Sequence, residues 1–152
     1  MRISGNVINT NGISERIIQI SLKVSKRYIL VLTQVYAPTT SYIDEEVDYF
    51  YEQVAQCLSN KKNHYNVVIG DFNAKVGKKL TVQEKYIEIH GLGTRNERGQ
   101  KLLDFATAQN TKIANTFFKK QKTRKWTWRS PNSEQFNEID YIFCRWISSL
   151  KM

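Results

Sequence analysis

The chain has 152 residues, of which 41% are hydrophobic and 24% are charged, and its 23 lysines and arginines outnumber its 14 acids. This composition excludes a disordered protein, and no apolar run is long enough to span a bilayer or to act as a signal peptide. We therefore expect one intracellular globular domain without a membrane partner. The net charge of +9 favours a polyanionic partner, although a merely soluble basic surface would explain the charge equally well.

The first half of the chain predicts a hairpin followed by a helix. Residues Ile17–Val24 alternate between apolar and polar side chains, and a short polar link leads into the apolar run Tyr28–Tyr36. Two such runs joined so briefly predict an antiparallel hairpin, and Pro38 ends its second strand because proline cannot donate to the ladder. Ser41 and the acids after it indicate a helix start, and apolar residues at helical spacing continue to about Asn60.

The second half predicts a buried strand, a helix and three short strands. The continuously apolar run Tyr65–Gly70 is typical of a strand buried on both faces. A helix is predicted over about Arg98–Asn110, and β-like runs follow at Lys112–Phe118, Lys125–Arg129 and Glu138–Cys144. At both ends of the chain, neighbouring strands are separated only by turns. This pattern predicts a fold in which helices cover largely antiparallel or mixed sheets.

The cysteines and one basic, aromatic segment have simpler interpretations. Cys57 and Cys144 lie far apart in the sequence, so we expect reduced, buried side chains and neither a disulfide nor a zinc site. The segment Lys119–Arg129 combines cations with aromatic rings and could contact nucleic acid. For Trp126 and Trp128 we expect packing in the core or in the wall of a site, and for the lysines a diffuse affinity for DNA.

Asp71 and Asn73 are the first candidates for chemistry. They directly follow the apolar strand, and α/β folds commonly place active sites at the carboxyl ends of strands. A carboxylate can orient and deprotonate a water molecule, and an amide two residues later can donate a hydrogen bond to an oxyanion. A plain turn explains the same spacing, because Asp and Asn cap their own backbone in turns. From spacing alone, the turn is the favoured interpretation.

Four motifs in order along the chain resemble the endonuclease/exonuclease/phosphatase superfamily. Val67–Ala74 (VVIGDFNA) is similar to the family's G-D-[FL]-N signature. Thr33–Pro38 (TQVYAP), Thr127–Arg129 (TWR) and Glu138–Phe143 (EIDYIF) are similar to three further family elements. Gly91–Gly99 (GLGTRNERG) is similar to the endonuclease domains of non-LTR retrotransposons, above all to the derived craniofacial development protein 2-like sequences.

The resemblance implies a fold, an activity and a partner. The fold is α/β (α+β), a four-layered sandwich of two mixed, largely antiparallel sheets flanked by helices. The activity is Mg²⁺-dependent nicking of DNA by phosphodiester hydrolysis, with DNA bound through its phosphate backbone and with no small-molecule organic cofactor. A nuclear location is compatible with such a substrate. A phosphatase for small phosphoesters shares the superfamily, but the retrotransposon-like stretch argues against it.

The resemblance also implies roles for individual residues. Asp71 would be the general base or the carboxylate that positions water, and Asn73 would stabilise the transition state beside it. Tyr36 would contact the scissile phosphate. Asp140 would orient a catalytic histidine and fix its tautomer. Two further residues are assigned to substrate binding by a looser match: Asn96 and Arg129.

The sequence departs from the family pattern at both ends. Nothing in Met1–Ser14 resembles the family's opening strands, and Glu15 follows serine instead of glutamine, so the metal-binding glutamate has no match. The chain ends at Met152, before the family's closing S-D-H element could occur. We therefore expect residues 1–152 to form a single partial domain, without those opening strands, without the closing catalytic segment and without the main Mg²⁺ ligands.

The two histidines do not replace the missing one. His64 and His90 both precede Asp140, whereas the family's histidine follows it, so we expect surface or loop positions for both. Phosphodiester hydrolysis needs charge neutralisation that a metal ion normally supplies. We therefore expect impaired or absent activity. The alternative function is a non-catalytic, basic, nucleic-acid-binding remnant of such an endonuclease, and the sequence does not indicate an oligomeric state.

Overall fold

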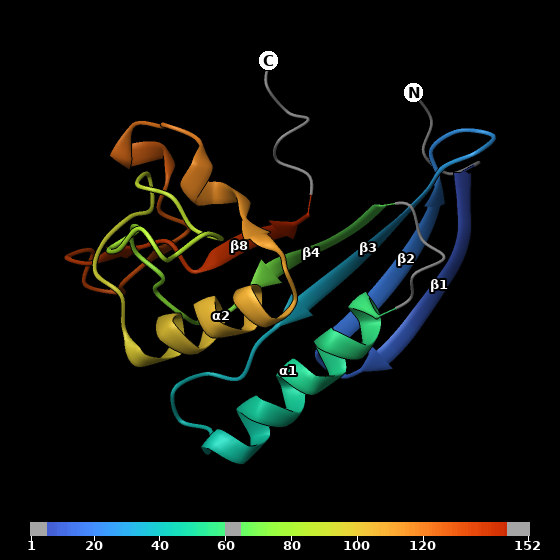
Figure 1. Cartoon of the computed structure of the whole chain (residues 1–152). Coiled ribbons are helices and arrows are strands. Elements are labelled where there is room, and N and C mark those ends of the chain that lie inside the picture. The colour runs from blue at the N-terminus through green and yellow to red at the C-terminus, as the bar shows by residue number, and fades with distance from the viewer. Residues whose placement is uncertain (1–5, 60–64, 146–152) are drawn as a thin grey trace.

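A six-stranded sheet with two helices on one face forms the body of the molecule (Figure 1). The computed structural model describes residues 6–59 and 65–145. The strand order is β1-β2-β3-β4-β8-β5, and a second sheet pairs β6 with β7. The elements are β1 (Val7–Ser14), β2 (Ile17–Lys23), β3 (Ile29–Tyr36), α1 (Asp44–Leu58), β4 (Tyr65–Asp71), α2 (Glu97–Ala108), β5 (Lys112–Ile113), η2 (Ala114–Phe117), η3 (Lys122–Arg124), β6 (Trp128–Arg129), β7 (Phe136–Asn137) and β8 (Asp140–Cys144). The mixed α/β class expected from the sequence is confirmed.

The predicted hairpin is present, and an unpredicted strand flanks it. β2 and β3 pair antiparallel from Ile17 opposite Val35 to Lys23 opposite Ile29. β1 lies at the edge of the sheet and pairs antiparallel with β2, with two shifts of register. Almost every side chain of β1 is exposed, so the strand has no alternating apolar pattern by which the sequence could have predicted it. Main-chain hydrogen bonds to β2 hold it in the sheet.

The core lies between the sheet and the two helices. Apolar side chains of α1 at helical spacing are buried there, as predicted, and three acids in its first turn favour the positive end of the helix dipole. α2 contributes Leu102 and Leu103, and the sheet contributes alternate residues such as Val68 and Phe143. Cys57 and Cys144 are buried thiols, as expected. Neither helix is long and apolar enough to cross a bilayer, nor is any other helical segment in residues 6–59 and 65–145.

The face of the sheet opposite the helices carries apolar side chains that remain partly accessible. Ile20, Leu32 and Val67 are lateral neighbours on β2, β3 and β4, and all three are half-buried. Ile142 on β8 is 47% exposed. The prediction that β4 is buried on both faces is therefore wrong, because the helices cover only the side on which Val68 is fully buried.

The β-like runs near the end of the chain are shorter strands than predicted. After Ile113 the chain turns into η2, where the Thr116 hydroxyl donates to the Ile113 carbonyl at 2.8 Å. The Asn115 side chain replaces a backbone partner for β8, since its Oδ1 accepts a hydrogen bond from the Ile142 N–H at 3.0 Å. Side-chain hydrogen bonds thus end the pairing of β5 with β8 after two residues.

Of the two packing modes expected for Trp126 and Trp128, packing in the core is wrong, whereas Trp126 does line a surface pocket, together with Leu92 and Phe136. The Trp126 and Trp128 side chains are 37% and 39% exposed. The physical reason is that β6 belongs to the small second sheet, outside the main core. The Trp126 ring instead packs against Phe136, with 5.1 Å between ring centroids.

Gly70 allows the close contact between β3 and β4 that precedes Asp71. Its φ is +144°, and a Cβ atom there would lie 2.0 Å from the Val35 carbonyl oxygen. We expect Gly70→Ala to lower the free energy of unfolding by about 3 kcal/mol, measured by urea denaturation. Gly12→Ala is the control, because a Cβ atom at Gly12 meets nothing within 4 Å. Equal effects of the two substitutions would contradict this role of Gly70.

Candidate functional site

Three of the sequence-predicted site residues lie in one row across three strands. Tyr36 is the partner of Asp71 in the parallel pair of β3 and β4, and Asp71 is the partner of Asp140 in the antiparallel pair of β4 and β8. Laterally paired residues point to the same side of a sheet, so the phenol and both carboxylates share the face away from the helices. Motifs far apart in the sequence thus meet at one end of the sheet.

Asp71 and Asn73 form a turn that also joins two strand ends. The Asn73 N–H donates to Asp71 Oδ1 at 2.8 Å, and Asn73 has a positive φ of 47°. The Asn73 side-chain Nδ2 donates to the Ala37 carbonyl at 2.8 Å, while the Ala37 N–H donates to the Asp71 carbonyl at 2.8 Å. The self-capping turn expected from the spacing is therefore present, and it is bonded directly to the residue after Tyr36.

The environment of Asp71 disfavours its charged form. Partial burial raises the pKa of the Asp71 carboxyl above its ordinary value, and the negative charge of Asp140 acts in the same direction. The Asn73 N–H opposes both by stabilising the carboxylate. A general base works best when its pKa approaches the operating pH, so these effects move Asp71 toward that role.

The two facing carboxylates supply part of a metal-binding set. Within residues 6–59 and 65–145, no group of three or more His, Cys, Asp or Glu side chains is placed to hold a metal ion. Mg²⁺ is commonly held by one or two protein carboxylates together with substrate phosphates and water. Asp71 and Asp140, which are lateral partners on β4 and β8, match that smaller contribution, and a cation bound by them would counter the burial and the Asp140 charge that together raise the pKa of Asp71.

Tyr141, which the sequence interpretation passed over, supports the loop that begins at Asp71. Its side chain is 1% exposed, and its hydroxyl oxygen accepts from the Val76 N–H at 3.1 Å. The hydroxyl donates toward the Glu138 carbonyl at 2.6 Å, with the Ala74 carbonyl 3.1 Å away. Burial raises the pKa of Tyr141 far above its usual value. Alternation along Glu138–Phe143 was the available signal, because it sets Tyr141 on the side opposite Asp140.

Asn96 joins the same loop to α2. As the N-cap of this helix, its Oδ1 accepts from the Gly99 N–H at 2.8 Å and from the Lys75 N–H at 3.1 Å. The Asn96 N–H also donates to the Lys75 carbonyl at 3.0 Å. A Cβ atom at Gly99 would lie 1.8 Å from that carbonyl oxygen, so only glycine permits this approach. The side-chain oxygen of Asn96 is thus committed to the fold.

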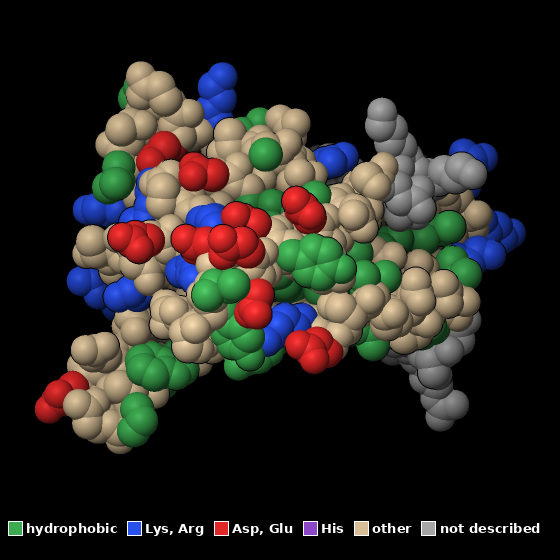
Figure 2. All heavy atoms as spheres, turned by 90° about the horizontal axis from the view of Figure 1, so that it is seen from below, with side chains coloured by type: hydrophobic (Ala, Val, Ile, Leu, Met, Phe, Trp, Pro, Cys, Tyr) green, Lys and Arg blue, Asp and Glu red, His purple; other side chains and the backbone are tan. Residues whose placement is uncertain are grey.

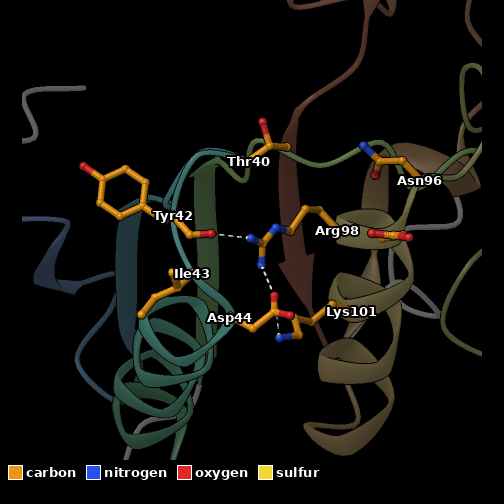
Figure 3. Close-up of a pocket in the computed structure, with 8 residues that line it drawn as sticks. Thr40, Tyr42, Ile43, Asp44, Asn96, Arg98 and Lys101 are labelled. Carbon is orange, nitrogen blue, oxygen red and sulfur yellow. Dashed lines mark hydrogen bonds and ion pairs between the residues drawn. The ribbon is translucent and has the colours of Figure 1, made fainter.

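A cavity of about 560 Å³ lies between the N-terminal ends of α1 and α2 (Figure 3). Arg98 crosses it from α2, donating to Asp44 Oδ1 at 2.9 Å and to the Tyr42 carbonyl at 2.8 Å. Lys101 forms an ion pair with Asp48 at 2.6 Å. Both basic residues of the lining are therefore paired with acids of α1, and the contacts of Arg98 hold the segment after Tyr36 against α2. Acidic side chains gather over the middle of the helical face (Figure 2).

The other sequence-predicted residues lie away from the row of Tyr36, Asp71 and Asp140. Arg129 is exposed on β6, with its guanidinium 5.5 Å from the centroid of the Phe136 ring. None of the described contacts joins Arg129 to the row. His90 lies in a turn, where its N–H donates to the Thr116 carbonyl at 3.1 Å, so the loop prediction is confirmed. His64 lies outside the described residues.

Removing the Tyr141 hydroxyl should destabilise the loop without altering the core shape. Tyr141→Phe leaves the buried Val76 N–H without its acceptor, which typically costs about 1–3 kcal/mol. We expect this decrease in the free energy of unfolding measured by chemical denaturation. Tyr49→Phe on α1 is the control, because Tyr49 is 62% exposed and should change stability by less than about 0.5 kcal/mol. A decrease no larger than that of the control would contradict the assignment.

The raised pKa of Asp71 predicts that its charge reduces stability at neutral pH. A carboxyl with a raised pKa in the folded chain contributes stability below its ordinary pKa, and this contribution is lost as the pH rises through the folded-state pKa. Asp71→Asn keeps an acceptor for the Asn73 N–H and removes the charge. We expect it to raise the melting temperature at pH 7 by on the order of 1 °C, with no gain near pH 4.

The control for this pH dependence is Asp104→Asn at an exposed position of α2. Melting curves of the chain and both variants between pH 4 and pH 8 provide the measurement. A gain for Asp71→Asn that does not grow with pH would refute the charge argument.

Comparison with curated proteins shows sequence relatives along almost the whole chain. Craniofacial development protein 2 of Tragulus javanicus is 36% identical over 155 aligned positions, and that of Bos taurus is 35% identical over 155. Each alignment includes 99% of this chain, but the chain spans only 26% and 25% of these relatives. No protein-family model matches the chain.

Solved structures with the same fold are more distant in sequence. The endonuclease domain of TRAS1, a telomere-specific non-LTR retrotransposon, has a TM-score of 0.52 and 13% identity, with 85% of this chain and 50% of that chain covered. An endonuclease/exonuclease/phosphatase family protein from Leptotrichia buccalis gives 0.51 and 13%, with 86% and 42% covered. The 3′ phosphatase NExo from Neisseria, bound to a product DNA hairpin, gives 0.53 and 13%, with 85% and 51% covered.

These matches agree with the family resemblance of the four motifs. At 13% identity the solved structures establish the fold, and the curated relatives establish kinship in sequence. The resemblance drawn from the motifs is confirmed: the chain has the fold of the endonuclease/exonuclease/phosphatase family and is a relative of part of craniofacial development protein 2.

Proposed function

We propose that the chain carries the phosphodiester-hydrolysing site of a DNA endonuclease of the retrotransposon type. The observation that carries this proposal is the row of Tyr36, Asp71 and Asp140 across three adjacent strands. It is supported by proteins of the same fold, among them a retrotransposon endonuclease domain and a phosphatase bound to a DNA hairpin. The net charge of +9 also favours a polyanionic substrate. A chromosomal DNA substrate would require a nuclear location.

Each residue of the row has a proposed task, and so has Asn73 in the turn after Asp71. Asp71 positions and deprotonates the attacking water, a task to which its raised pKa is suited. Tyr36 is 49% exposed, so its hydroxyl can donate to an oxygen of the scissile phosphate. Asn73 uses one N–H of its side-chain amide to bind Ala37, which leaves the second for charge developing in the transition state. Asp140 is the carboxylate that would orient a histidine.

Asp71 and Asp140 are the residues that would hold a divalent cation, Mg²⁺ by the family resemblance. When bound, it would neutralise charge on the phosphoryl oxygens. The sequence has no match for the family's metal-binding glutamate or for its catalytic histidine. Removing one of several cooperating catalytic groups can slow a reaction almost as much as removing all of them. We therefore propose that the 152-residue polypeptide hydrolyses DNA weakly by itself.

Residues 1–152 are proposed to form a single, partial domain. The apolar side chains of Ile20, Leu32 and Val67 on the uncovered face support this, since such a face is typical of a sheet that packs against another layer. The chain also matches about half the length of the TRAS1 domain, with 50% of it covered. The uncovered face is therefore proposed to be where the rest of the sandwich packs.

A second candidate function is nucleic-acid binding without catalysis. The observation that favours it is the use of the Asn73 side chain as a tether, since its Nδ2 donates to the Ala37 carbonyl at 2.8 Å. The excess of 23 basic over 14 acidic residues would then serve phosphate binding alone. Because both candidate functions use the positive charge in the same way, only a cleavage assay separates them.

A plasmid-nicking assay distinguishes the two functions. We expect the chain to convert supercoiled plasmid to the open circle slowly in Mg²⁺ and not in chelator. Asp71→Ala should lower this slow rate by about 10-fold, because it removes the group that activates water while the cooperating glutamate and histidine are already missing. Asp104→Ala, an exposed carboxylate on α2, should nick at the rate of the unaltered chain.

Two results of this assay would change the assignment. Nicking that Asp71→Ala leaves unchanged would refute the catalytic role of the row. Salt-sensitive DNA binding without any Mg²⁺-dependent nicking would replace the endonuclease proposal with the non-catalytic one.

A further inference from the structure

A second cavity, of about 410 Å³, lies beside β8 and has an unusual set of charges. Its polar lining consists of Asn115, Lys120, Arg124, Lys125, Thr127 and Glu138. Three of these side chains are basic and one is acidic. The segment from Lys120 to Thr127 that forms one wall includes η3, which positions Arg124.

The acidic residue of this cavity is already neutralised within the fold. Glu138 is 3% exposed in its side chain, and Lys125 is 7% exposed, with Nζ 3.8 Å from Glu138 Oε1. Lys125 Nζ also donates to the Asn115 carbonyl at 2.8 Å. Glu138 accepts from the Leu92 N–H at 3.2 Å and from Asn115 Nδ2 at 3.2 Å. The two buried charges balance each other, and their hydrogen bonds fix the floor of the cavity.

The other two basic residues of the cavity, Lys120 and Arg124, are not paired with an acid of the described chain. Lys120 and Arg124 are exposed, and neither side chain forms an ion pair or hydrogen bond with any residue that the structure describes. Their charges therefore add to a net positive potential in the cavity. An arginine with all its donors available can bind a phosphate group through two parallel hydrogen bonds.

The cavity shares its wall with the strand that carries Asp140. Thr127 Oγ1 accepts from the Asp140 N–H at 3.2 Å and from the Ile139 N–H at 3.2 Å. Asn115 Nδ2 donates to the Asp140 carbonyl at 3.0 Å. An anion held by Lys120 and Arg124 would thus lie next to the row of Tyr36, Asp71 and Asp140, on the β8 side of that row. The Thr127 hydroxyl hydrogen remains available to the same anion.

We propose that this cavity is a second phosphate-binding site, in which Lys120 and Arg124 bind a phosphate group of the nucleic-acid backbone close to the one at the Asp71 row. The inference rests on the proposed function, because it gives a substrate contact to that same site. Free inorganic phosphate shares the chemistry and is the competing source. The two exposed cations would hold the nucleic-acid strand in a defined path across the end of β8. The total charge of the protein would only attract the nucleic acid diffusely.

The main experiment measures DNA affinity as a function of salt. A fluorescent duplex is titrated in chelator with the full chain, with Lys120→Ala/Arg124→Ala, and with the control Lys26→Ala/Arg27→Ala, which removes the same charge from exposed positions outside the cavity. We expect the cavity variant to bind about 10-fold more weakly at low salt. The slope of log K against log salt should fall by about 0.9 for each bound phosphate that the cavity variant no longer neutralises. The control should keep the slope of the unaltered chain.

A second arm identifies the source of the phosphate. The ¹⁵Nε resonance of Arg124 is followed while either inorganic phosphate or a short oligonucleotide is added. We expect the oligonucleotide to saturate the shift at a concentration at least 10-fold lower. Equal or tighter saturation by inorganic phosphate would overturn the assignment to a nucleic-acid backbone. Equal slopes and affinities for the cavity variant and the control would overturn the site itself.

Failure of this inference is distinguishable from failure of the endonuclease proposal. If Asp71→Ala abolishes nicking while the cavity variant binds DNA as the control does, hydrolysis stands and the second phosphate site is refuted. If the chain does not nick DNA but loses affinity through Lys120 and Arg124 alone, the second site stands and hydrolysis is refuted.

Discussion

The buried hydroxyl of Tyr141 is the contact on which the geometry of the candidate site depends. It lies under the loop that begins at Asp71, accepts the Val76 N–H, and donates toward the chain just before its own strand. Tyr141 directly follows Asp140 in β8. Tyr141 therefore holds the loop on the helix side of the sheet, while Asp140 is the lateral partner of Asp71. The loop is therefore fixed to the same strand that supplies the second carboxylate. Gly99 and Asn96 complete this fixation by bringing the start of α2 against Lys75.

The basic residues beside β8 differ from those of the helical face in whether an acid pairs with them. On the helical face, Asp44, Asp48, Arg98 and Lys101 pair with one another, so the basic residues there are occupied. Beside β8, Lys120 and Arg124 are not paired within the described chain. The net charge of +9 alone says little about the partner. The positions of the basic residues that no acid pairs with say more.

The sequence predicted the hairpin, the first helix and the Asp71 turn well, because each has a strong local signal: alternation, helical spacing, and self-capping side chains. It also brought Tyr36, Asp71 and Asp140 to one site, but only through motif resemblance, since their pairing depends on the order of β3, β4 and β8 in the sheet. β1 was missed because edge pairing needs no apolar pattern. Burial of β4 and of the tryptophans was overestimated, because apolar character does not reveal whether another layer covers it. Tyr141 was overlooked, although alternation separated it from Asp140.

The apolar side chains on the uncovered face of the sheet also affect how the stability of this chain depends on temperature. Unfolding increases the heat capacity in proportion to the apolar surface that it newly exposes to water. Ile20, Leu32 and Val67 are half-exposed, and Ile142 is 47% exposed, so part of that surface is hydrated before unfolding begins. The increase in heat capacity for the chain alone is accordingly smaller than for a covered sheet of this size. The free energy of unfolding of the chain alone is therefore lower and changes less with temperature. A layer packed on this face would increase both the free energy of unfolding and its dependence on temperature.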